Sequence, residues 1–289
     1  RAYGEGGQGY VRSEGGGVVV LRTTERTRSN RDRSYATILA TGLNSAGRTN
    51  GISLPSREMQ ASLLRDVYRR HDLDPNDLAF IEGHGTGTKV GDPAELWAIG
   101  TELGQKRNQR LLVGSVKSNV GHSEPASGMF GLIKAALALQ HDFLPASLHA
   151  PELNSEIDFE GLNVEINRSG HSLSRGQRRR LAGVNSFGFG GTNAHIVLAD
   201  PEKAAVSDAG TLPSGPFMVS AQTRSALEGL LENYVQELKG DRPDRHELVA
   251  VSALNRTRHK HRFAVDSEDP DVVRKGAEEF LAGSSTGLG

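Results

Sequence analysis

Residues 78–93 read LAFIEGHGTGTKVGDP. The apolar run at 78–81 predicts a buried strand, and the amphipathic segment that begins at Pro93 predicts a helix. His84 therefore lies on a glycine-flanked loop at the carboxyl end of a strand, which is where open α/β sheets bind ligands. The glycines on either side of this histidine let the backbone turn sharply and approach a ligand closely.

Asp92 has a structural interpretation within this stretch. It stands immediately before Pro93, and Glu95 follows three residues later. A capping Asp, a Pro at the first helical position and a Glu further on form a variant of the capping box. We therefore expect Asp92 to act mainly as the N-cap of the helix that follows.

The composition limits the partners and the chemistry of the chain. Its 289 residues, 36% apolar and 24% charged, are enough for a large core in one or two globular domains. Lys and Arg number 34 against 35 Asp and Glu, which argues against nucleic acid or an anionic membrane as the main partner. The absence of cysteine excludes disulfides, thiolate metal sites and a cysteine nucleophile within this chain.

The N-terminus and the apolar runs of the sequence indicate where in the cell the protein is expected. The N-terminus has no secretory signal, and no apolar run approaches the roughly 20 residues needed to span a bilayer. We therefore expect a cytoplasmic protein with no membrane partner. Because the first residue is Arg1 rather than Met, we also expect the chain to be part of a longer polypeptide.

Strands and helices alternate along the first 200 residues, which predicts an α/β fold. The expected strands are 18–21, 35–40, 78–81, 111–116, 181–187 and 194–198, and the expected helices are 57–70, 93–104 and 125–140. The last of these helices is apolar nearly all round, which predicts burial on every side, between two sheets. The last two strands predict a hairpin around a glycine turn. Loops are expected at 1–17, 22–34 and 141–180.

The sequence changes character at residues 200–215, which are polar and contain Gly and Pro. This predicts a boundary between domains at 1–200 and 201–289. The second domain is expected to be a small α+β module, with strands near 217–220 and 262–265 and helices near 222–239, 246–254 and 270–282. Its basic run at 256–262 predicts a solvated face or, more specifically, a contact with another domain or a carrier protein.

Three loops that each follow a strand carry groups suited to chemistry on a carbonyl. The first offers His84, the second Lys117 and His122, and the third a glycine turn with free backbone N–H groups around Phe189. Neutral imidazoles can stabilise an enolate as it develops, and backbone N–H groups can form half of an oxyanion hole. Lys117 either orients a carboxylate or forms a salt bridge, for which Glu124 is a candidate.

Two other kinds of site suit these residues less well. Both histidines with Asp92 or Glu124 could hold zinc, but the chain has no His-x-x-x-His or His-x-x-Glu-His pairing. A serine hydrolase of the α/β type would carry a Gly-x-Ser-x-Gly elbow, which this chain lacks. We therefore expect no metal and no serine nucleophile.

The loops carry three motifs, which are HGTGT with GDP at 84–93, KSNVGH at 117–122 and NSFGFGGTNAH at 185–195. In this order and spacing they resemble the β-ketoacyl synthase domain of type I polyketide synthases. YVRSEG at 10–15 is also similar to that family. The resemblance covers about residues 1–200, and the module beyond resembles, more weakly, the linker that joins a ketosynthase to the next domain.

The resemblance implies a thiolase-like fold, in which two similar α/β halves stack as five layers, αβαβα. This chain would be the second half, followed by the small α+β linker domain. The family's nucleophilic cysteine belongs to the first half, so an N-terminal half outside this chain would supply it. The resemblance also implies a homodimer of the complete domain, no cofactor in the ketosynthase itself, and substrates carried on the phosphopantetheine of an acyl carrier protein.

The implied reaction is a decarboxylative Claisen condensation that elongates a polyketide. An acyl chain is held as a thioester on the cysteine, a malonyl-type extender loses CO₂, and the resulting carbanion attacks the thioester. His84 and His122 would promote decarboxylation and hold the enolate, and Lys117 would hydrogen-bond near His122 and pair with Glu124. The backbone of Phe189 would help to form the oxyanion hole. The gating loop would be Gly188, Phe189, Gly190 and Gly191, and the supporting residues would be Thr86, Thr88, Asn119 and Glu124.

Two variants of this family are alternatives to an elongating enzyme. A non-elongating or decarboxylase-only ketosynthase differs at the nucleophile or loses the second histidine, and a non-catalytic chain-length-type partner subunit usually loses both histidines. Because His84 and His122 are both present, elongation is favoured. Without its cysteine this chain alone is expected to be inactive, and to expose apolar surface that the other half covers.

Overall fold

The chain divides into two compact units, Arg1–Ala204 and Ala205–Gly289. The sequence predicted the boundary after residue 200. The computed structural model describes residues 1–30, 34–49, 51, 54–174, 178–201, 215–240, 245–252 and 257–283. Within these ranges, every helix is too short or too polar to cross a membrane.

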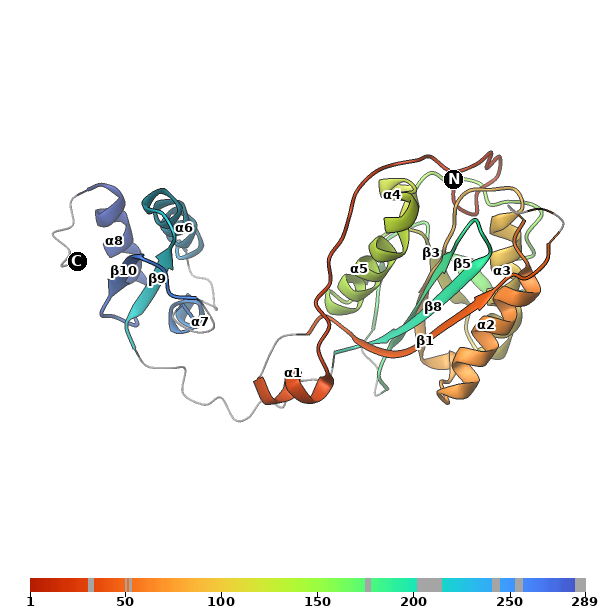
Figure 1. Ribbon diagram of the computed structural model, residues 1–289, viewed down its shortest axis with the longest axis horizontal. Coiled ribbons are helices and arrows are strands. Elements are labelled where there is room, and N and C mark those ends of the chain that lie inside the picture. The colour runs from red at the N-terminus through yellow and green to blue at the C-terminus, as the bar shows by residue number, and fades with distance from the viewer. Residues whose placement is uncertain are drawn as a thin grey trace. The chain divides into compact units, whose positions relative to one another are not determined.

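A six-stranded mixed sheet forms the centre of the first unit (Figure 1). In spatial order its strands are β1 (Thr37–Ser45), β8 (Thr192–Ala199), β7 (Leu181–Phe187), β2 (Leu78–Glu82), β3 (Leu111–Gly114) and β5 (Val164–Ile166). β7, β2, β3 and β5 are parallel, whereas β8 pairs antiparallel with both β7 and β1. The carboxyl ends of β2, β3 and β7 therefore meet at one edge of the sheet.

Helices cover both faces of this sheet. α2 (Arg57–Arg70) and α3 (Gly91–Glu102) pack on one face and share a core with Ile81 of β2. α5 (Ser127–Gln140) packs on the other face against β7, β2 and β8, and shares a core with Phe80. Successive strand residues point to opposite faces, which is why Phe80 and Ile81 belong to different cores. The first unit is thus a three-layer αβα arrangement.

Most of the predicted elements of the first unit are confirmed. α2 begins after Ser56, whose hydroxyl accepts a hydrogen bond from the Met59 amide at 3.2 Å, and it buries Leu63, Leu64 and Val67. The strands predicted around β1, β2, β3, β7 and β8 are present, and β7 and β8 form the predicted hairpin.

The described residues of the region 141–180, which was expected to be loop, contain three short strands. Val164 and Ile166 of β5 are buried and extend the sheet beside β3. Strands this short show too few alternations to stand out from a loop in the sequence. The remaining short elements are α1 (Thr24–Asn30), where a charged loop was expected, η1 (Pro75–Asp77), η2 (Gly104–Lys106), α4 (Lys117–Val120), η3 (Glu124–Ala126), β4 (Phe143–Leu144) and β6 (His171–Ser172).

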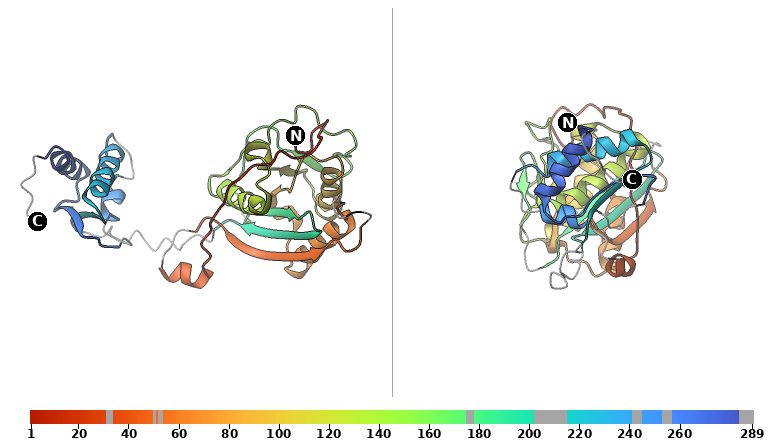
Figure 2. Two further views of the ribbon diagram at one scale, coloured as in Figure 1. Left: turned by 45° about the horizontal axis from the view of Figure 1, so that its top comes forward. Right: turned by 90° about the vertical axis from the view of Figure 1, so that its left-hand side faces the viewer.

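The prediction of a buried strand at 18–21 is wrong. Val18 and Val20 are 90% and 87% exposed, and the segment pairs with no strand in the part of the chain that the structure describes. Just before it, the backbone runs beside α5 (Figures 1 and 2), so close that a Cβ on Gly17 would meet Met129. The apolar run lies in solvent because no described residue covers it.

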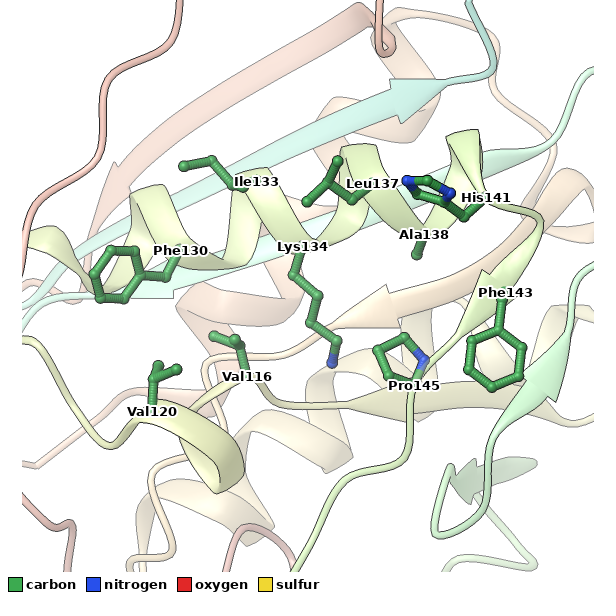
Figure 3. A pocket seen from close by; sticks show the side chains of 10 residues that line it. All are labelled: Val116, Val120, Phe130, Ile133, Lys134, Leu137, Ala138, His141, Phe143 and Pro145. Carbon is green, nitrogen blue, oxygen red and sulfur yellow. The ribbon is translucent and has the colours of Figure 1, made fainter. Parts of the chain in front are cut away.

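α5 is fully covered on one face only. Ala135 and Leu139 are buried against the sheet, whereas Leu137 on the outer face is 39% exposed. Burial on every side would need a second large sheet, and the described residues form one. The outer face borders an apolar groove of about 480 Å³ (Figure 3), lined mainly by Val116, Val120, Phe130, Ile133, Phe143 and Pro145.

The second unit is the small α+β module that the sequence predicts. Its elements are β9 (Phe217–Ala221), α6 (Arg224–Glu237), α7 (Arg245–Ala250), β10 (His261–Val265) and α8 (Pro270–Leu281). The two strands pair antiparallel, and the helices enclose a core that includes Phe217 and Phe263. In the basic run, Arg258 and Lys260 are exposed, as a solvated face requires, and Arg256 lies outside the described residues.

Candidate active site

Two loops at the carboxyl edge of the sheet bring His84 and His122 together. His84 follows β2, and His122 follows β3 and the short helix α4. Because β2 and β3 are parallel neighbours, both loops leave the same edge of the sheet. The centroids of the two imidazoles are 5.5 Å apart, and the rings are nearly perpendicular. The structure therefore places the two histidines in one site.

Lys117, the first residue of α4, contacts the His84 ring. Its Nζ lies 3.4 Å from His84 Nδ1. An ammonium group has no acceptor, so Nδ1 accepts and the proton of a neutral His84 lies on Nε2. Burial, followed by the charges of Lys117 and His122, holds the pKa of His84 well below its ordinary value. His84 is therefore a neutral hydrogen-bond donor at neutral pH.

The backbone fixes His122 in the same state. The Glu124 amide donates a hydrogen bond to His122 Nδ1 at 3.0 Å, which again leaves the proton on Nε2. Burial and the charge of Lys117 lower the pKa of His122, and Glu124 opposes this shift. The Tyr10 ring lies against His122 with a centroid distance of 4.7 Å. Both imidazoles therefore present an Nε2–H donor.

Lys117 and Glu124 do not pair, contrary to the expectation from the sequence. Lys117 contacts His84 rather than His122, and the Glu124 carboxylate lies 2.7 Å from Arg12 Nε. The reason is the backbone at Gly121, which ends α4 with a φ of +75° and lies against the N-terminal segment. Glu124 consequently faces that segment.

Glu95 of α3 holds the backbone of the His84 loop. Its Oε1 accepts hydrogen bonds from the His84 amide at 2.7 Å and from Asn185 Nδ2 at 2.9 Å. Its Oε2 accepts from the Gly85 amide at 2.8 Å and from the Tyr3 hydroxyl at 2.9 Å. All four partners are donors, so the position suits an ionised carboxylate, which only accepts. Such charge-assisted hydrogen bonds are roughly twice as strong as neutral ones.

Asp92 binds the same loop, and its predicted role as an N-cap is wrong. α3 begins at Gly91, and its N-cap makes no side-chain hydrogen bond. The Asp92 carboxylate instead accepts from the amides of Tyr3, Thr86 and Gly87 at 2.6, 3.1 and 3.0 Å. Burial raises the pKa of Asp92 to about 6, and the hydrogen bond from Tyr3 opposes the rise. Asp92 thus binds amides of the His84 loop and of Tyr3, whereas a capping Asp would bind amides in the first turn of its own helix.

A buried ion pair lies beneath the two loops. Glu82, the last residue of β2, is 1% exposed, and its Oε2 lies 2.7 Å from Lys134 Nζ of α5. Its Oε1 accepts a hydrogen bond from the Val116 amide, which fixes the start of the Lys117 loop. Burial raises the pKa of Glu82, and Lys134 opposes the rise. Sequence reasoning overlooked Glu82 because a buried acid at the end of a strand carries no pattern of its own.

The predicted supporting residues lie around the loops. The hydroxyls of Thr86 and Thr88 are 3.0 Å apart, and Thr88 Oγ1 accepts from the Gly91 amide at 3.1 Å, so both threonines close the His84 loop. Asn119 is exposed on α4, where it accepts from the Ser118 hydroxyl. Among the residues that the structure describes, no cluster of three His, Asp or Glu side chains could hold a metal ion.

The glycine turn formed by Gly188, Phe189, Gly190 and Gly191 leaves the same edge of the sheet, where β7 ends. Phe187, the last residue of β7, has its ring centroid 5.8 Å from that of His84. The turn is closed by a hydrogen bond from the Gly188 amide to the carbonyl of Thr192 at 2.7 Å. The Phe189 side chain is 68% exposed. The turn therefore borders the site with its aromatic side chain in solvent.

Two protein families match consecutive parts of the chain. Residues 35–151 match the family described as "Beta-ketoacyl synthase, C-terminal domain". Residues 154–265 match the family described as "Ketoacyl-synthetase C-terminal extension". Together the two matches include the His84 loop, the Lys117 loop and the glycine turn.

Similar proteins are large synthases. The chain is 38% identical to polyketide synthase GfsA of Streptomyces halstedii over 292 residues, which are 96% of this chain and 4% of that protein. It is 35% identical to erythronolide synthase EryA2 of Saccharopolyspora erythraea over 294 residues, which are 99% of this chain and 8% of that protein. The chain therefore spans a small part of each of these relatives.

Solved ketosynthase structures share the fold. The oxazolomycin ketosynthase domain OzmH KS7 of Streptomyces albus JA3453 has a TM-score of 0.85 at 32% identity, and the match covers 97% of this chain and 50% of that chain. The ketosynthase from module 6 of the bacillaene synthase of Bacillus subtilis 168 has a TM-score of 0.78 at 30% identity, with 92% and 47% covered. The predicted thiolase-like fold is thus confirmed, with this chain spanning about half of each ketosynthase chain. The chain belongs to the β-ketoacyl synthase family of type I polyketide synthases, of which it carries the C-terminal domain and its extension.

Proposed function

We propose that this chain is the C-terminal part of an elongating ketosynthase, which joins an acyl chain to a malonyl-type extender by decarboxylative Claisen condensation. The observation that carries the proposal is the pair of neutral imidazoles at one sheet edge, each with an Nε2–H unused within the described residues. Two such donors in one site suit a carbonyl oxygen that becomes an enolate oxygen. The similarity to polyketide synthases supports the substrate class.

The proposed reaction has three steps. A cysteine thiolate of the preceding half attacks the incoming acyl thioester, and the carrier thiol leaves. The malonyl thioester then loses CO₂, and the electron pair of the broken C–C bond forms an enolate whose oxygen accepts from Nε2–H of His84 and of His122. The enolate carbon attacks the acyl-cysteine carbonyl, and the tetrahedral intermediate expels the thiolate to release a β-ketoacyl thioester. The backbone amide of Phe189 would help to hold that oxyanion.

Lys117 orients His84 in this proposal. Its ammonium group donates to Nδ1, so the tautomer with the proton on Nε2 is the one that faces the enolate. Its positive charge also favours the neutral form of the imidazole. The carboxylates of Asp92 and Glu95 hold the backbone of the His84 loop in place while the acyl thioester and then the malonyl thioester bind and react.

The proposed partners follow from the parts of the reaction that this chain does not contain. The N-terminal half of the ketosynthase would supply the cysteine and cover the outer face of α5. An acyl carrier protein would deliver both thioesters on its phosphopantetheine arm, and the ketosynthase itself would need no cofactor. The complete domain would be a homodimer, and it would work in the cytoplasm.

The test is His122→Ala in the complete synthase. Removing one of two enolate donors should lower the condensation rate by roughly 10²-fold or more, while acylation of the cysteine, measured by mass spectrometry, stays intact. Arg69→Ala on the outer side of α2 is the control and should change neither rate. Chain extension at the normal rate in His122→Ala would contradict the proposal, and so would a loss of acylation in step with condensation.

A further inference from the structure

His195 is a buried histidine that the proposed reaction does not use. It lies on β8 opposite Asn185 of β7, and 0% of its surface is exposed. Tyr68 and Asn185, which lie beside it, are also buried, so the ring reaches no substrate from this position. Its hydrogen bonds lead to the His84 loop instead.

Two side chains connect His195 to that loop. His195 Nδ1 lies 2.6 Å from Asn185 Oδ1, and Asn185 Nδ2 donates to Glu95 Oε1 at 2.9 Å. The same Glu95 oxygen accepts from the His84 amide at 2.7 Å. An amide oxygen only accepts, so His195 Nδ1 carries the proton and its Nε2 is an acceptor.

Tyr68 of α2 lies at the far end of this series. The Tyr68 hydroxyl and His195 Nε2 are both buried, and neither has a partner within the described residues. The two ring centroids are 5.6 Å apart. A Cβ on Gly183 would lie 2.8 Å from His195 Cε1 and 3.2 Å from the Tyr68 oxygen, so this glycine keeps the space beside both groups open. A hydroxyl donor thus stands near an imidazole acceptor, which suits a direct or water-mediated hydrogen bond.

We propose that His195 is a positioning residue for the condensation, because through Asn185 and Glu95 it fixes the backbone that carries His84. The inference rests on the function proposed above. Rotation of the Asn185 amide by 180° would point its oxygen at the Glu95 carboxylate and replace an attraction with a repulsion. The Nδ1–H of His195 selects the orientation in which Nδ2 faces Glu95.

The charge state of His195 agrees with this role. Burial lowers the pKa of His195 to about 3, so the ring stays neutral at neutral pH. A neutral imidazole presents one donor and one acceptor, which are what Asn185 and Tyr68 require, whereas an imidazolium presents two donors. A leucine at this position would fill a similar space and present neither group.

The test compares His195→Leu with His195→Asn in the complete synthase. Asn keeps an amide N–H near the position of Nδ1, and Leu keeps no polar atom. We expect His195→Leu to lower kcat for condensation by about 10²-fold, which is the scale of the loss when a catalytic group such as His84 is misplaced by about 1 Å. The KM for the malonyl-type extender and the rate of cysteine acylation should not change, and His195→Asn should recover most of the lost kcat.

The pH dependence of kcat separates positioning from a loss of stability. A loosened loop would let water reach His84, so its lowered pKa should rise towards the usual value of about 6.5. Because condensation needs the neutral ring, the acidic limb of the profile should move to higher pH in His195→Leu. Asn185→Ala should move the limb in the same way, and it serves as the second variant should His195→Leu fail to fold.

Asn193→Ala is the matched control. Asn193 lies on the same strand as His195, is 3% exposed, and donates a hydrogen bond to Asn44 at 2.9 Å, away from the His84 loop. It should lower the stability of the domain without moving the acidic limb. Equal shifts in Asn193→Ala and His195→Leu, or a normal kcat in His195→Leu, would overturn the inference. These outcomes in the variants contradict only the role of His195. A wild-type synthase that does not condense would contradict the proposed function, on which that role rests, so failure of the inference and failure of the proposed function are distinguishable.

Discussion

Lys117 contacts the His84 ring, and its own charge depends on buried acids. Burial lowers the pKa of Lys117, while the carboxylates of Glu95, Glu82 and Asp92 favour its charged form. These acids also bind the loop backbones, so they have a structural and an electrostatic effect at once. Burial, followed by the charge on Lys117, in turn lowers the pKa of His84 and keeps the ring neutral.

Lys117→Met should shift the pH dependence of condensation. The substitution keeps the apolar stem of the side chain and removes the charge that favours neutral His84, so the pKa of His84 should rise. Since the reaction needs the neutral ring, activity should be lost at a higher pH as acid is added. The measurement is the single-turnover condensation rate between about pH 5 and 8. An acidic limb at the wild-type pH would contradict the assigned effect of Lys117.

At the scale of single residues, Asp92 and Glu95 show what a local sequence pattern can predict and what it cannot. Their spacing before and after Pro93 matches a capping box, and the pattern correctly singles them out. Their partners, however, are the amide and hydroxyl of Tyr3 and the amides of the His84 loop. Tyr3 is 89 residues from Asp92 in the chain, so no local rule could have assigned it.

At the scale of elements, the N-terminal segment 1–17 acts as a clamp on both histidine loops. The Gly9 amide donates to the carbonyl of Gly87 at 3.1 Å, and the Ser13 amide donates to the carbonyl of His122 at 2.9 Å. The segment has no regular secondary structure, so it carries no periodicity that would predict these contacts. The geometry of the site thus depends on a loop rather than on the sheet alone.

Gly83→Ala should release this clamp. A Cβ on Gly83 would collide with the Tyr3 hydroxyl and approach Glu95 Oε1 to 3.3 Å, so Tyr3 would have to leave its place. We expect a loss of stability of about 1–3 kcal/mol, the usual cost of overpacking. Amides of residues 1–17 should exchange hydrogen faster in the complete ketosynthase, as measured by mass spectrometry.

Gly229→Ala is the control for that substitution. Gly229 lies inside α6, and nothing lies within 4 Å of a Cβ placed on it. Replacing a helical Gly with Ala should stabilise the second unit by about 0.5–1 kcal/mol and leave exchange in residues 1–17 unchanged. Faster exchange there in Gly229→Ala, or normal exchange in Gly83→Ala, would contradict the clamp.

Elements that carry their own signals were predictable from the sequence. α2, α6 and α8 each begin directly after a residue whose side chain caps the helix, namely Ser56, Thr223 and Asp269. The strands β2 and β7 each begin with a run of apolar residues and glycine, at 78–81 and 181–184, and both lead into glycine-containing loops. β5 and α1 were missed because a three-residue strand and a charged seven-residue helix show no clear period.

At the scale of the whole molecule, the failed prediction at 18–21 and the half-covered helix α5 have one explanation. Both present apolar side chains to solvent, where burial against another layer would be favourable. The chain spans about half of the ketosynthase structures that it resembles. A pattern of apolar residues predicts that a surface is buried. It does not say whether the residues that cover this surface belong to the same segment of chain.

Single cysteines can test whether the complete ketosynthase covers these surfaces, because this chain has no cysteine of its own. Val20→Cys and Leu137→Cys replace side chains that are 87% and 39% exposed here. We expect both thiols to resist alkylation in the complete domain, because the preceding half should exclude reagent and water from them. Arg69→Cys on the opposite face of the sheet is the control and should react readily. Mass spectrometry of the labelled peptides gives the rates, and a Val20→Cys thiol that reacts as fast as the Arg69→Cys thiol would show that the apolar run stays uncovered.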